Sequence, residues 1–360
     1  MFTRIVLDNF LSFGHVEFNL SGAYGKPLNY AFVYGENGSG KTNLVRSIAF
    51  LQNITNAVAG NDGIDSLGAI HGKHAMAQAD GQMHVRYEFI LDGKRGWYDL
   101  TFTMTGDVCR EELVYSTPKG NRGRYFLIEK TMDFPSVSLG KEIFRGELSK
   151  NLKKEMNRLW GKNTALAIIS SEYSRNTSTY MDRWSFEGMG TVLEFIQSIS
   201  TNIDPQGMPG HSPVPYLQNI DHGWIERIDA AVLDAYEEAV SSFFIRLCSD
   251  IRDIRYERRV DGSSIEYRLM VTREIAGKER VIPFEDESSG IKKLLSLFPS
   301  LMSCALGSVT FIDELDSGIH DKMVRDLISQ AMDAIGGQLV VTTHNTSLLE
   351  TLDPRHVFVI

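Results

Sequence analysis

The octapeptide Gly35–Thr42, GENGSGKT, follows the apolar run at 30–34 and constrains the fold more than any other feature of the chain. It meets the pattern G-x-x-x-x-G-K-[ST], in which glycines let backbone N–H groups turn inward around phosphate oxygens. Apolar residues then recur at helical spacing from position 44 to position 51. A strand, a glycine-rich loop and a helix in this order predict a phosphate-binding loop in an α/β fold, rather than a turn that binds nothing.

The polar residues of this loop have expected roles. Lys41 would reach the β- and γ-phosphates of a nucleotide, and the hydroxyl of Thr42 would take one position around Mg²⁺. The helix that follows adds the positive end of its dipole. The residues expected to contact ATP here are Gly35, Asn37, Gly38, Ser39, Gly40, Lys41, Thr42 and Asn43.

Composition limits the compartment and the partners. The 360 residues can bury the core of one large domain or two, and the net charge of −9 gives no overall basic field for nucleic acid. Three isolated cysteines, at 109, 248 and 304, have neither zinc-ligand nor disulfide spacing. Charged Arg4 and Asp8 interrupt the apolar residues near the N-terminus, unlike in a secretory signal. We therefore expect a cytoplasmic protein without a membrane span.

Periodicity predicts an interrupted nucleotide-binding sheet. Strands are expected at 2–8 and 30–34, a loop or a loose helix at 55–82, and an antiparallel meander at 83–130. Helices are expected at 141–200 and from Trp224 to Asp253, with a loop between them at 204–215. Strand-like runs follow at 254–260, 265–273 and 279–284. From Ser288 the pattern alternates again, with strands at 309–312, 339–342 and 357–360. The expected parts are an N-terminal half at 1–140, a helical insertion at 141–253 and a C-terminal half at 254–360.

A second group of polar residues follows the later strands. Asp313 and Glu314 come directly after the run at 309–312, where an open parallel sheet carries its catalytic groups. Asp313 would bind Mg²⁺ and Glu314 would act as general base toward water. An acidic start of the next helix is the alternative, and the phosphate-binding loop argues for catalysis. His344, after the next strand, would hydrogen-bond the γ-phosphate or the attacking water.

The segment Glu287–Lys293 opens a helix with a Ser-x-Gly sequence. Ser288 or Ser289 would serve as an N-cap, which is a common structural use. The same helix N-terminus would also bind an anion. An anion site far from the chain's own loop is useful when it reaches the phosphate held by a partner.

Five segments together resemble the ABC-type ATPase heads of the SMC/RecF/OLD group: Asn9–Phe13, Gly35–Thr42, Glu287–Lys293, Phe311–Asp316 with His320, and Thr342–His344. The resemblance is closest to the short AbiL/OLD-like prokaryotic AAA ATPases of phage-defence loci. It implies a P-loop NTPase fold with a mixed or parallel nucleotide-binding sheet, an antiparallel β lobe and a helical insertion. Members of the group usually continue past the strand that corresponds to residues 357–360.

The resemblance assigns further roles. Ser288 and Gly290 fall on the signature motif, which contacts the γ-phosphate bound by the opposite subunit. Asp313 and Glu314 form the Walker B pair, Asp316 lies in the D-loop, and His344 is the switch histidine. ATP would hold two heads together, and hydrolysis would reopen the dimer or a higher homo-oligomer.

Some positions depart from the group's pattern. Ile291 stands where many members carry a polar residue, which would reduce the signature contacts. Leu11 replaces a basic residue, which weakens a contact to adenine or phosphate. For the Q-loop, Gln78 and Gln82 are the two candidates.

The leading hypothesis is an ATPase that controls or scaffolds a partner effector, a nuclease or toxin encoded nearby, in anti-phage defence. The alternative is a RecF-like DNA repair ATPase. DNA contact would need one of two basic clusters, which lie at Lys150, Lys153, Lys154 and Arg158 or at Arg252, Arg255, Arg258 and Arg259. Both are also typical of solvated surfaces. The intact Lys41, Asp313 and Glu314 argue against a scaffold that does not hydrolyse ATP, and the ABC-like elements argue against a kinase.

Overall fold

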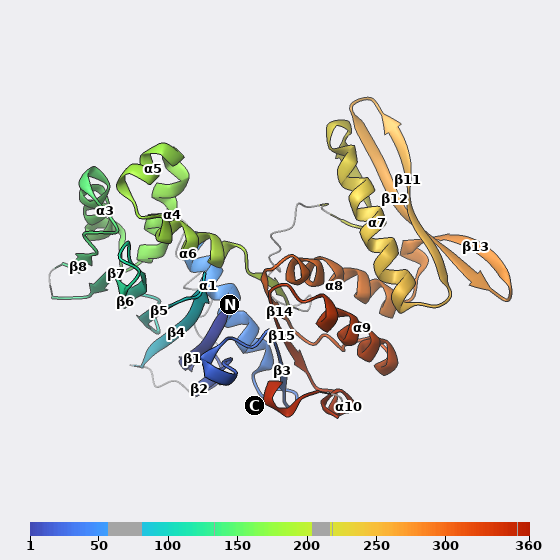
Figure 1. Cartoon of the computed structure of the whole chain (residues 1–360), viewed down its shortest axis with the longest axis horizontal. Helices are drawn as coiled ribbons and strands as arrows, with labels where there is room; N and C mark the ends of the chain where they lie inside the picture. Colours follow the sequence, from blue (N-terminus) through green and yellow to red (C-terminus); the bar gives the residue numbers. More distant parts are fainter. Residues whose placement is uncertain (57–80, 133, 204–216, 218, 351) are drawn as a thin grey trace.

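The computed structural model describes residues 1–56, 81–132, 134–203, 217, 219–350 and 352–360. In these residues the chain forms one parallel and two antiparallel sheets with helices packed against them (Figure 1). The mixed α/β fold expected from the sequence is therefore confirmed. The loop or loose helix expected at 55–82 and the loop expected at 204–215 lie mostly outside the described residues. None of the helices in the described part of the chain is long and apolar enough to cross a membrane.

The parallel sheet at the centre of the molecule combines both ends of the chain, as predicted. Its order is β16-β3-β15-β14-β9 and every neighbouring pair is parallel. The strands are β3 (Tyr30–Tyr34), β9 (Ser200–Asn202), β14 (Val309–Ile312), β15 (Gln338–Thr343) and β16 (Val357–Val359). Strand β9 differs from the expected helix through residue 200. Its three residues are too few to show the alternating hydrophobic pattern of a strand, and they become a strand by pairing with β14.

This sheet separates two hydrophobic cores. Alternate side chains of a strand point to opposite faces. Ala31 and Val33 of β3 therefore join the core that contains α1 (Lys41–Asn56), whereas Phe32 joins the core of α8 (Ser289–Ala305) and α9 (Asp321–Ala334). The short helix α10 (Thr346–Leu349) follows β15. With both faces buried, the carboxyl ends of the strands are where polar side chains gather.

A seven-stranded antiparallel sheet packs beside the parallel one, in the order β2-β1-β4-β5-β6-β7-β8. Its strands are β1 (Phe2–Phe10), β2 (Phe13–Asn19), β4 (Gln82–Leu91), β5 (Lys94–Thr103), β6 (Val108–Ser116), β7 (Arg122–Glu129) and β8 (Ser136–Leu139). The meander predicted for 83–130 is confirmed. Along β4 buried residues alternate with more exposed ones, because one face packs on the core.

Gln338 links the two larger sheets at the start of β15. Its buried side chain accepts the Phe2 N–H (2.8 Å) and donates to the carbonyl oxygens of Phe2 (2.9 Å) and Leu28 (2.8 Å). A side-chain amide can satisfy several buried backbone groups at once, and each would be costly to leave unpaired. One residue thus ties β1 to the central sheet.

Four helices follow the antiparallel sheet: α3 (Gly146–Leu159), α4 (Ala165–Arg175), α5 (Ser178–Trp184) and α6 (Glu187–Gln197). Helices α4 and α6 contact α1, the helix that follows the phosphate-binding loop. The expected insertion at 141–253 thus contains β9, β10 (His222–Glu226) and α7 (Ala230–Leu247) in addition to these helices.

Glu111 of β6 anchors α4 to the antiparallel sheet. Its carboxylate is completely buried and accepts hydrogen bonds from the N–H groups of Ala165 (2.6 Å) and Leu166 (3.1 Å) at the start of α4. Trp160 Nε1 (2.8 Å) and the Tyr98 hydroxyl (3.0 Å) also donate to it. Burial outweighs these donors and raises the pKa of Glu111 to about 7.

The small antiparallel sheet lies at the opposite end of the molecule from α3 and α5 (Figure 1). It contains β10, β11 (Ile251–Asp261), β12 (Ser264–Ile275) and β13 (Lys278–Pro283), and α7 packs on β11. The helix expected from Trp224 to Asp253 was wrong at both ends. Ile225 pairs with Ile265, and Ile251 pairs with Arg273, so cross-strand partners distant in sequence turn both ends into strands.

Candidate functional site

The predicted phosphate-binding loop lies between β3 and α1. The chain turns at Gly38 and Gly40, whose φ angles of 84° and 106° favour glycine. A Cβ on Gly40 would lie 2.7 Å from the ring of Phe13 and 2.8 Å from Ser12 Oγ, so no side chain fits there. The backbone therefore makes the tight curl that the glycine pattern predicts.

The side chains of the loop suit an anion. Lys41 is 4% exposed, and its Nζ donates to the carbonyl oxygens of Gly35 (2.7 Å) and Glu36 (2.9 Å). Ser39 Oγ is buried and makes no hydrogen bond within the described residues. A buried hydroxyl without a partner is costly, and a phosphate oxygen would supply the missing acceptor.

A cavity of about 350 Å³ opens beside the loop. Its lining combines six of the predicted ATP contacts with Glu314: Asn37, Gly38, Gly40, Lys41, Thr42 and Asn43. Sequence reasoning missed Arg46, which also lines the cavity and donates to Asn43 Oδ1 (3.4 Å). Arg46 lies one helical turn after Thr42 on the same face of α1, and this spacing would have identified it.

The acidic pair follows β14 directly. Asp313 is 2% exposed, and its Oδ1 accepts a hydrogen bond from Thr342 Oγ1 at 2.5 Å. Glu314 has a φ of 44°, which non-glycine residues rarely adopt, and its N–H donates to Thr342 Oγ1 at 2.8 Å. The two carboxylates therefore have different surroundings: one is fixed in the sheet and the other lines the cavity.

His344 directly follows β15, and Asp316 lies near it in the turn after β14. His344 Nδ1 is 3.5 Å from Asp316 Oδ2, and the imidazole is half-exposed whereas the carboxylate is buried. Asp316 Oδ1 has no hydrogen-bond partner among the described groups. The next residue, Asn345, donates through Nδ2 to Asp321 Oδ1 (2.8 Å). Asp316 thus faces the histidine of its own chain.

Ser288 and Gly290 lie at the N-terminus of α8. Ser288 is exposed and makes no capping hydrogen bond through its side chain within the described segment. A Cβ on Gly290 would lie 3.1 Å from the carbonyl oxygen of Gly318, so the helix start sits close to the Asp316–Gly318 turn. Neither Ser288 nor Gly290 lines the loop cavity as the described residues define it.

Arg273 holds the residue before this helix, a contact that sequence reasoning missed. Its Nε and Nη2 donate to the two carboxylate oxygens of Glu287 at 2.6 and 3.0 Å, and its Nη1 donates to Asp250. Such a two-point contact fixes both side chains. Arg273 lies on β12, and nothing in its local sequence connects it with Glu287.

The oxygen ligands present suit magnesium. Among the described residues, no group of three or more His, Cys, Asp or Glu side chains is arranged to hold a metal ion. Mg²⁺ bound with a nucleotide needs no such group, because it takes one or two carboxylates together with phosphate oxygens and water. Thr42 lines the cavity, and Asp313 precedes Glu314, which also lines it. Thr42 and Asp313 therefore offer oxygen donors of the kind that Mg²⁺ prefers.

The positions that depart from the family pattern have structural uses. Leu11 and Ile291 are buried, so each packs into a core rather than reaching a nucleotide. Asn43 Nδ2 donates to Ser12 Oγ (2.7 Å), which holds the segment before β2 over the loop. Gln82 begins β4 with an exposed side chain, and Gln78 lies outside the described residues.

The two basic clusters are partly neutralised. In the first, Lys150 pairs with Glu147 and Arg158 pairs with Glu155. In the second, Arg252 pairs with Glu274, and Arg258 pairs with Asp234 and Glu237. Exposed ion pairs of this kind lower the local positive charge that a phosphate backbone would meet.

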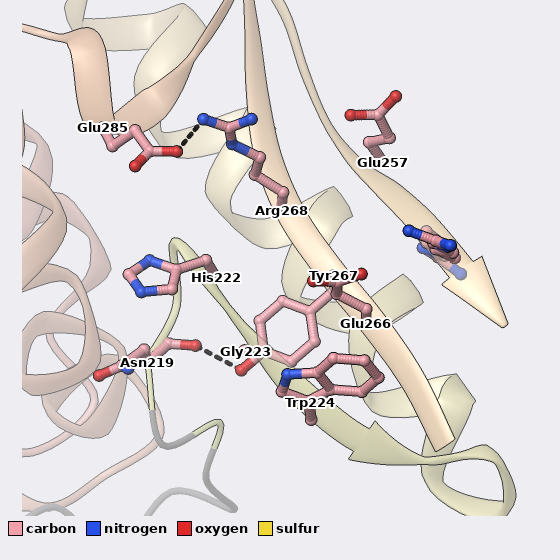
Figure 2. A pocket seen from close by; sticks show the side chains of 11 residues that line it. Asn219, His222, Gly223, Trp224, Glu257, Glu266, Tyr267, Arg268 and Glu285 are labelled. Atoms are coloured by element: carbon pink, nitrogen blue, oxygen red, sulfur yellow. Dashed lines mark hydrogen bonds and ion pairs between the residues drawn. The ribbon is translucent and has the colours of Figure 1, made fainter. Parts of the chain in front are cut away.

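A larger groove of about 900 Å³ lies on the small antiparallel sheet (Figure 2). Three arginines and three glutamates line it: Arg258, Arg259, Arg268, Glu257, Glu266 and Glu285. Arg268 pairs with Glu285, and the Tyr267 hydroxyl donates to the carbonyl oxygen of Asn219 (2.7 Å). Because these charges balance, the groove favours neither an anion nor a cation. The lining of the groove shares no residue with the cavity beside the phosphate-binding loop.

Two family models match parts of the chain. A family model described as "AAA domain" matches residues 4–188, more than half of the chain. A second model, described as "AAA domain, putative AbiEii toxin, Type IV TA system", matches residues 213–350. Among curated proteins, none matches the chain.

Two solved structures resemble the chain at low sequence identity. One is an SMC head domain from Thermotoga maritima, with 15% identity and a TM-score of 0.42. The other is an SmcHead bound to the C-winged helix domain of ScpA, with 16% identity and a TM-score of 0.49. Each alignment covers 98% of this chain and 92% of the other.

Proposed function

The chain belongs to the AAA domain family, and on that premise we propose that it binds ATP with Mg²⁺ and hydrolyses it to ADP and phosphate. The cavity beside the phosphate-binding loop supports this proposal most directly, because Lys41 and Glu314 both line it. A cation suited to phosphates and a carboxylate suited to a water molecule thus share one space.

In the proposed reaction each side chain has one task. Lys41 exchanges its two carbonyl acceptors for phosphate oxygens of ATP. Mg²⁺, when bound, draws charge from the β- and γ-phosphates, and Thr42 and Asp313 hold it. Glu314 accepts a proton from water while the water oxygen bonds to the γ-phosphorus and the bond from phosphorus to the bridging oxygen breaks. His344 donates a hydrogen bond to the γ-phosphate.

Two copies complete each ATP site in this proposal. Ser288 and Gly290 lie outside the loop cavity defined by the described residues, at a helix N-terminus suited to an anion. Helix α8 of one copy therefore binds the γ-phosphate on the other copy, and Asp316 acts at the same interface by holding His344. ATP stabilises the dimer because only the closed state completes its contacts, and hydrolysis reopens it.

The biological role we propose is control of a partner effector in defence against phage. The description of the second family model, with its putative AbiEii toxin, supports a role in a toxin or abortive-infection system. The resemblance to AbiL/OLD-like ATPases points the same way. The effector would be a nuclease or toxin encoded nearby. Co-expression with the neighbouring gene product tests this, since toxicity or its suppression should then depend on Lys41.

Glu314→Gln tests the catalytic proposal. We expect the variant to bind ATP like the wild type, to hydrolyse it at least about 100-fold more slowly, and to accumulate as a dimer with ATP, because Gln cannot accept the proton. Turnover is measured by phosphate release and size by light scattering. Glu238→Gln, an exposed change on α7, is the matched control. Normal turnover in Glu314→Gln would remove the residue from this role, and an inactive wild type would refute the ATPase itself.

A further inference from the structure

The hydroxyl of Thr342 joins the ends of two neighbouring strands. It donates to Asp313 Oδ1 at 2.5 Å and accepts from the backbone N–H of Glu314 at 2.8 Å. Thr342 is completely buried. A hydroxyl can donate and accept at once, whereas the methyl group of an equally shaped valine can do neither. One side chain thus contacts both members of the acidic pair.

These two bonds begin where the backbone pairing of the sheet stops. Strand β14 ends at Ile312, which pairs with Val341, while β15 continues to Thr343. Beyond that point the Thr342 side chain replaces the missing backbone partner of Glu314. The Thr342 carbonyl oxygen also accepts the N–H of Leu315 (3.3 Å). Both contacts hold the chain while Glu314 adopts its positive φ of 44°.

The same contacts orient the carboxylate of Asp313 and fix the backbone of Glu314. Asp313 Oδ1 is engaged by Thr342, and Oδ2 makes no hydrogen bond within the described part of the chain. The rotation of this carboxylate is therefore fixed, with one oxygen left for a cation or its water. The fixed backbone of Glu314 lets its side chain line the loop cavity.

We propose that Thr342 is a positioning residue for the ATPase reaction, which orients Asp313 toward Mg²⁺ and Glu314 toward the attacking water. This inference rests on the proposed function. Partners that orient a metal ligand from behind change metal affinity or activity by about 10- to 100-fold when removed. A merely structural threonine would affect stability alone.

Thr342→Val and Thr342→Ser test the proposal, with Thr310→Val as the matched control. Thr310 is also completely buried, and its hydroxyl donates to the carbonyl oxygen of Ser300 on α8, away from the acidic pair. Each protein is examined for affinity of a fluorescent ATP analogue with EDTA or with Mg²⁺. The Mg²⁺ concentration for half-maximal ATP turnover, kcat, and hydrogen exchange of the Glu314 amide in the free protein complete the comparison.

For Thr342→Val we expect unchanged nucleotide affinity in EDTA, a Mg²⁺ requirement raised about tenfold, a kcat lowered about 10- to 100-fold and faster exchange at Glu314. Thr342→Ser should restore all of these to near wild-type values, because it keeps the hydroxyl. If Thr342→Val does not fold, Thr342→Ala takes its place with the same expectations.

Values for Thr342→Val equal to those of Thr310→Val would overturn the proposal. The same holds if serine fails to rescue the valine defect, since the hydroxyl would then not be the cause. Failure of the wild type to hydrolyse ATP would instead refute the proposed function. The exchange rate of the Glu314 amide still reports on Thr342 in that case.

Discussion

Removing the Glu111 carboxylate tests how the helical region is attached to the antiparallel sheet. Glu111→Ala leaves three buried or half-buried N–H donors without their acceptor, two at the start of α4 and one on Trp160. The Tyr98 hydroxyl also loses its acceptor. Glu111→Gln is the milder change, because it keeps one carbonyl oxygen and turns an NH₂ group toward the remaining donors.

The size of the effect follows from these contacts. Each buried donor left unpaired costs about 1–3 kcal/mol, and water entering the vacated space recovers part of that cost. We therefore expect Glu111→Ala to lower the free energy of unfolding by about 3–5 kcal/mol, and Glu111→Gln by about 2 kcal/mol. The first value is a large share of the about 5–15 kcal/mol that stabilises an ordinary domain.

The free energy of unfolding lost in Glu111→Ala should depend on pH. Burial raises the pKa of Glu111 from 4.5 to about 7, so between these values the folded protein binds more protons than the unfolded chain. Stability therefore falls as pH rises through this window, by about 3 kcal/mol in total. The two variants lack this pH dependence, because neither alanine nor glutamine titrates. The gap between wild type and Glu111→Ala should thus shrink by about 2 kcal/mol between pH 5 and pH 8.

Urea unfolding followed by tryptophan fluorescence measures these differences at both pH values. Taking the difference between wild type and variant cancels the other groups that titrate in both. Glu129→Ala, an exposed change on β7, is the control and should cost less than about 0.5 kcal/mol. A gap that widens as pH rises would refute the reasoning, because the four donors would then outweigh burial and keep the carboxylate ionised.

Three further changes test the ATP site. Gly40→Ala should weaken ATP-analogue binding at least tenfold because its Cβ meets an aromatic ring; unchanged affinity contradicts this. Lys41→Ala and Ser288→Arg chains, each inactive alone, should regain about a quarter of wild-type turnover when mixed equally, because half of the dimers are mixed and each of these has one intact site. If no activity returns, the ATP site is not built from two copies. Arg273→Lys should slow turnover several-fold without changing nucleotide affinity, because lysine cannot hold both oxygens of Glu287. If the variant turns over ATP as fast as the wild type, the contact between Arg273 and Glu287 does not contribute to catalysis.

The local sequence was sufficient to predict those structural features of the site that lie within a single segment of the chain. The glycine pattern at Gly35–Thr42 predicts the shape of the loop backbone. The acidic pair after the run at 309–312 marks the end of a strand. The family models show an AAA domain, and the sheets confirm the mixed α/β fold expected from these motifs. The roles of Ser288, His344 and the other named site residues stay predictions, because they concern a bound nucleotide and a second copy.

Long-range contacts account for what the sequence did not reveal. Thr342 reads as one more residue of a buried strand, and only the packing of β15 beside β14 brings its hydroxyl to the acidic pair. Arg273 meets Glu287 through the pairing of β12 with its neighbours. Strand β10 forms because β12 lies beside it, although its five residues precede a strong helix. Periodicity within one segment carries no information about such partners.

Strand β3 precedes the phosphate-binding loop, and both of its neighbours, β15 and β16, come from residues 338–359. A growing chain on the ribosome therefore exposes an unpaired apolar β3 until residues 338–359 have emerged. The antiparallel sheet can pair before that point, but Phe2 meets Gln338 only after residue 338 has been made. ATP binding should thus require that segment, and a nascent chain stopped before residue 338 should depend on chaperones to avoid aggregation.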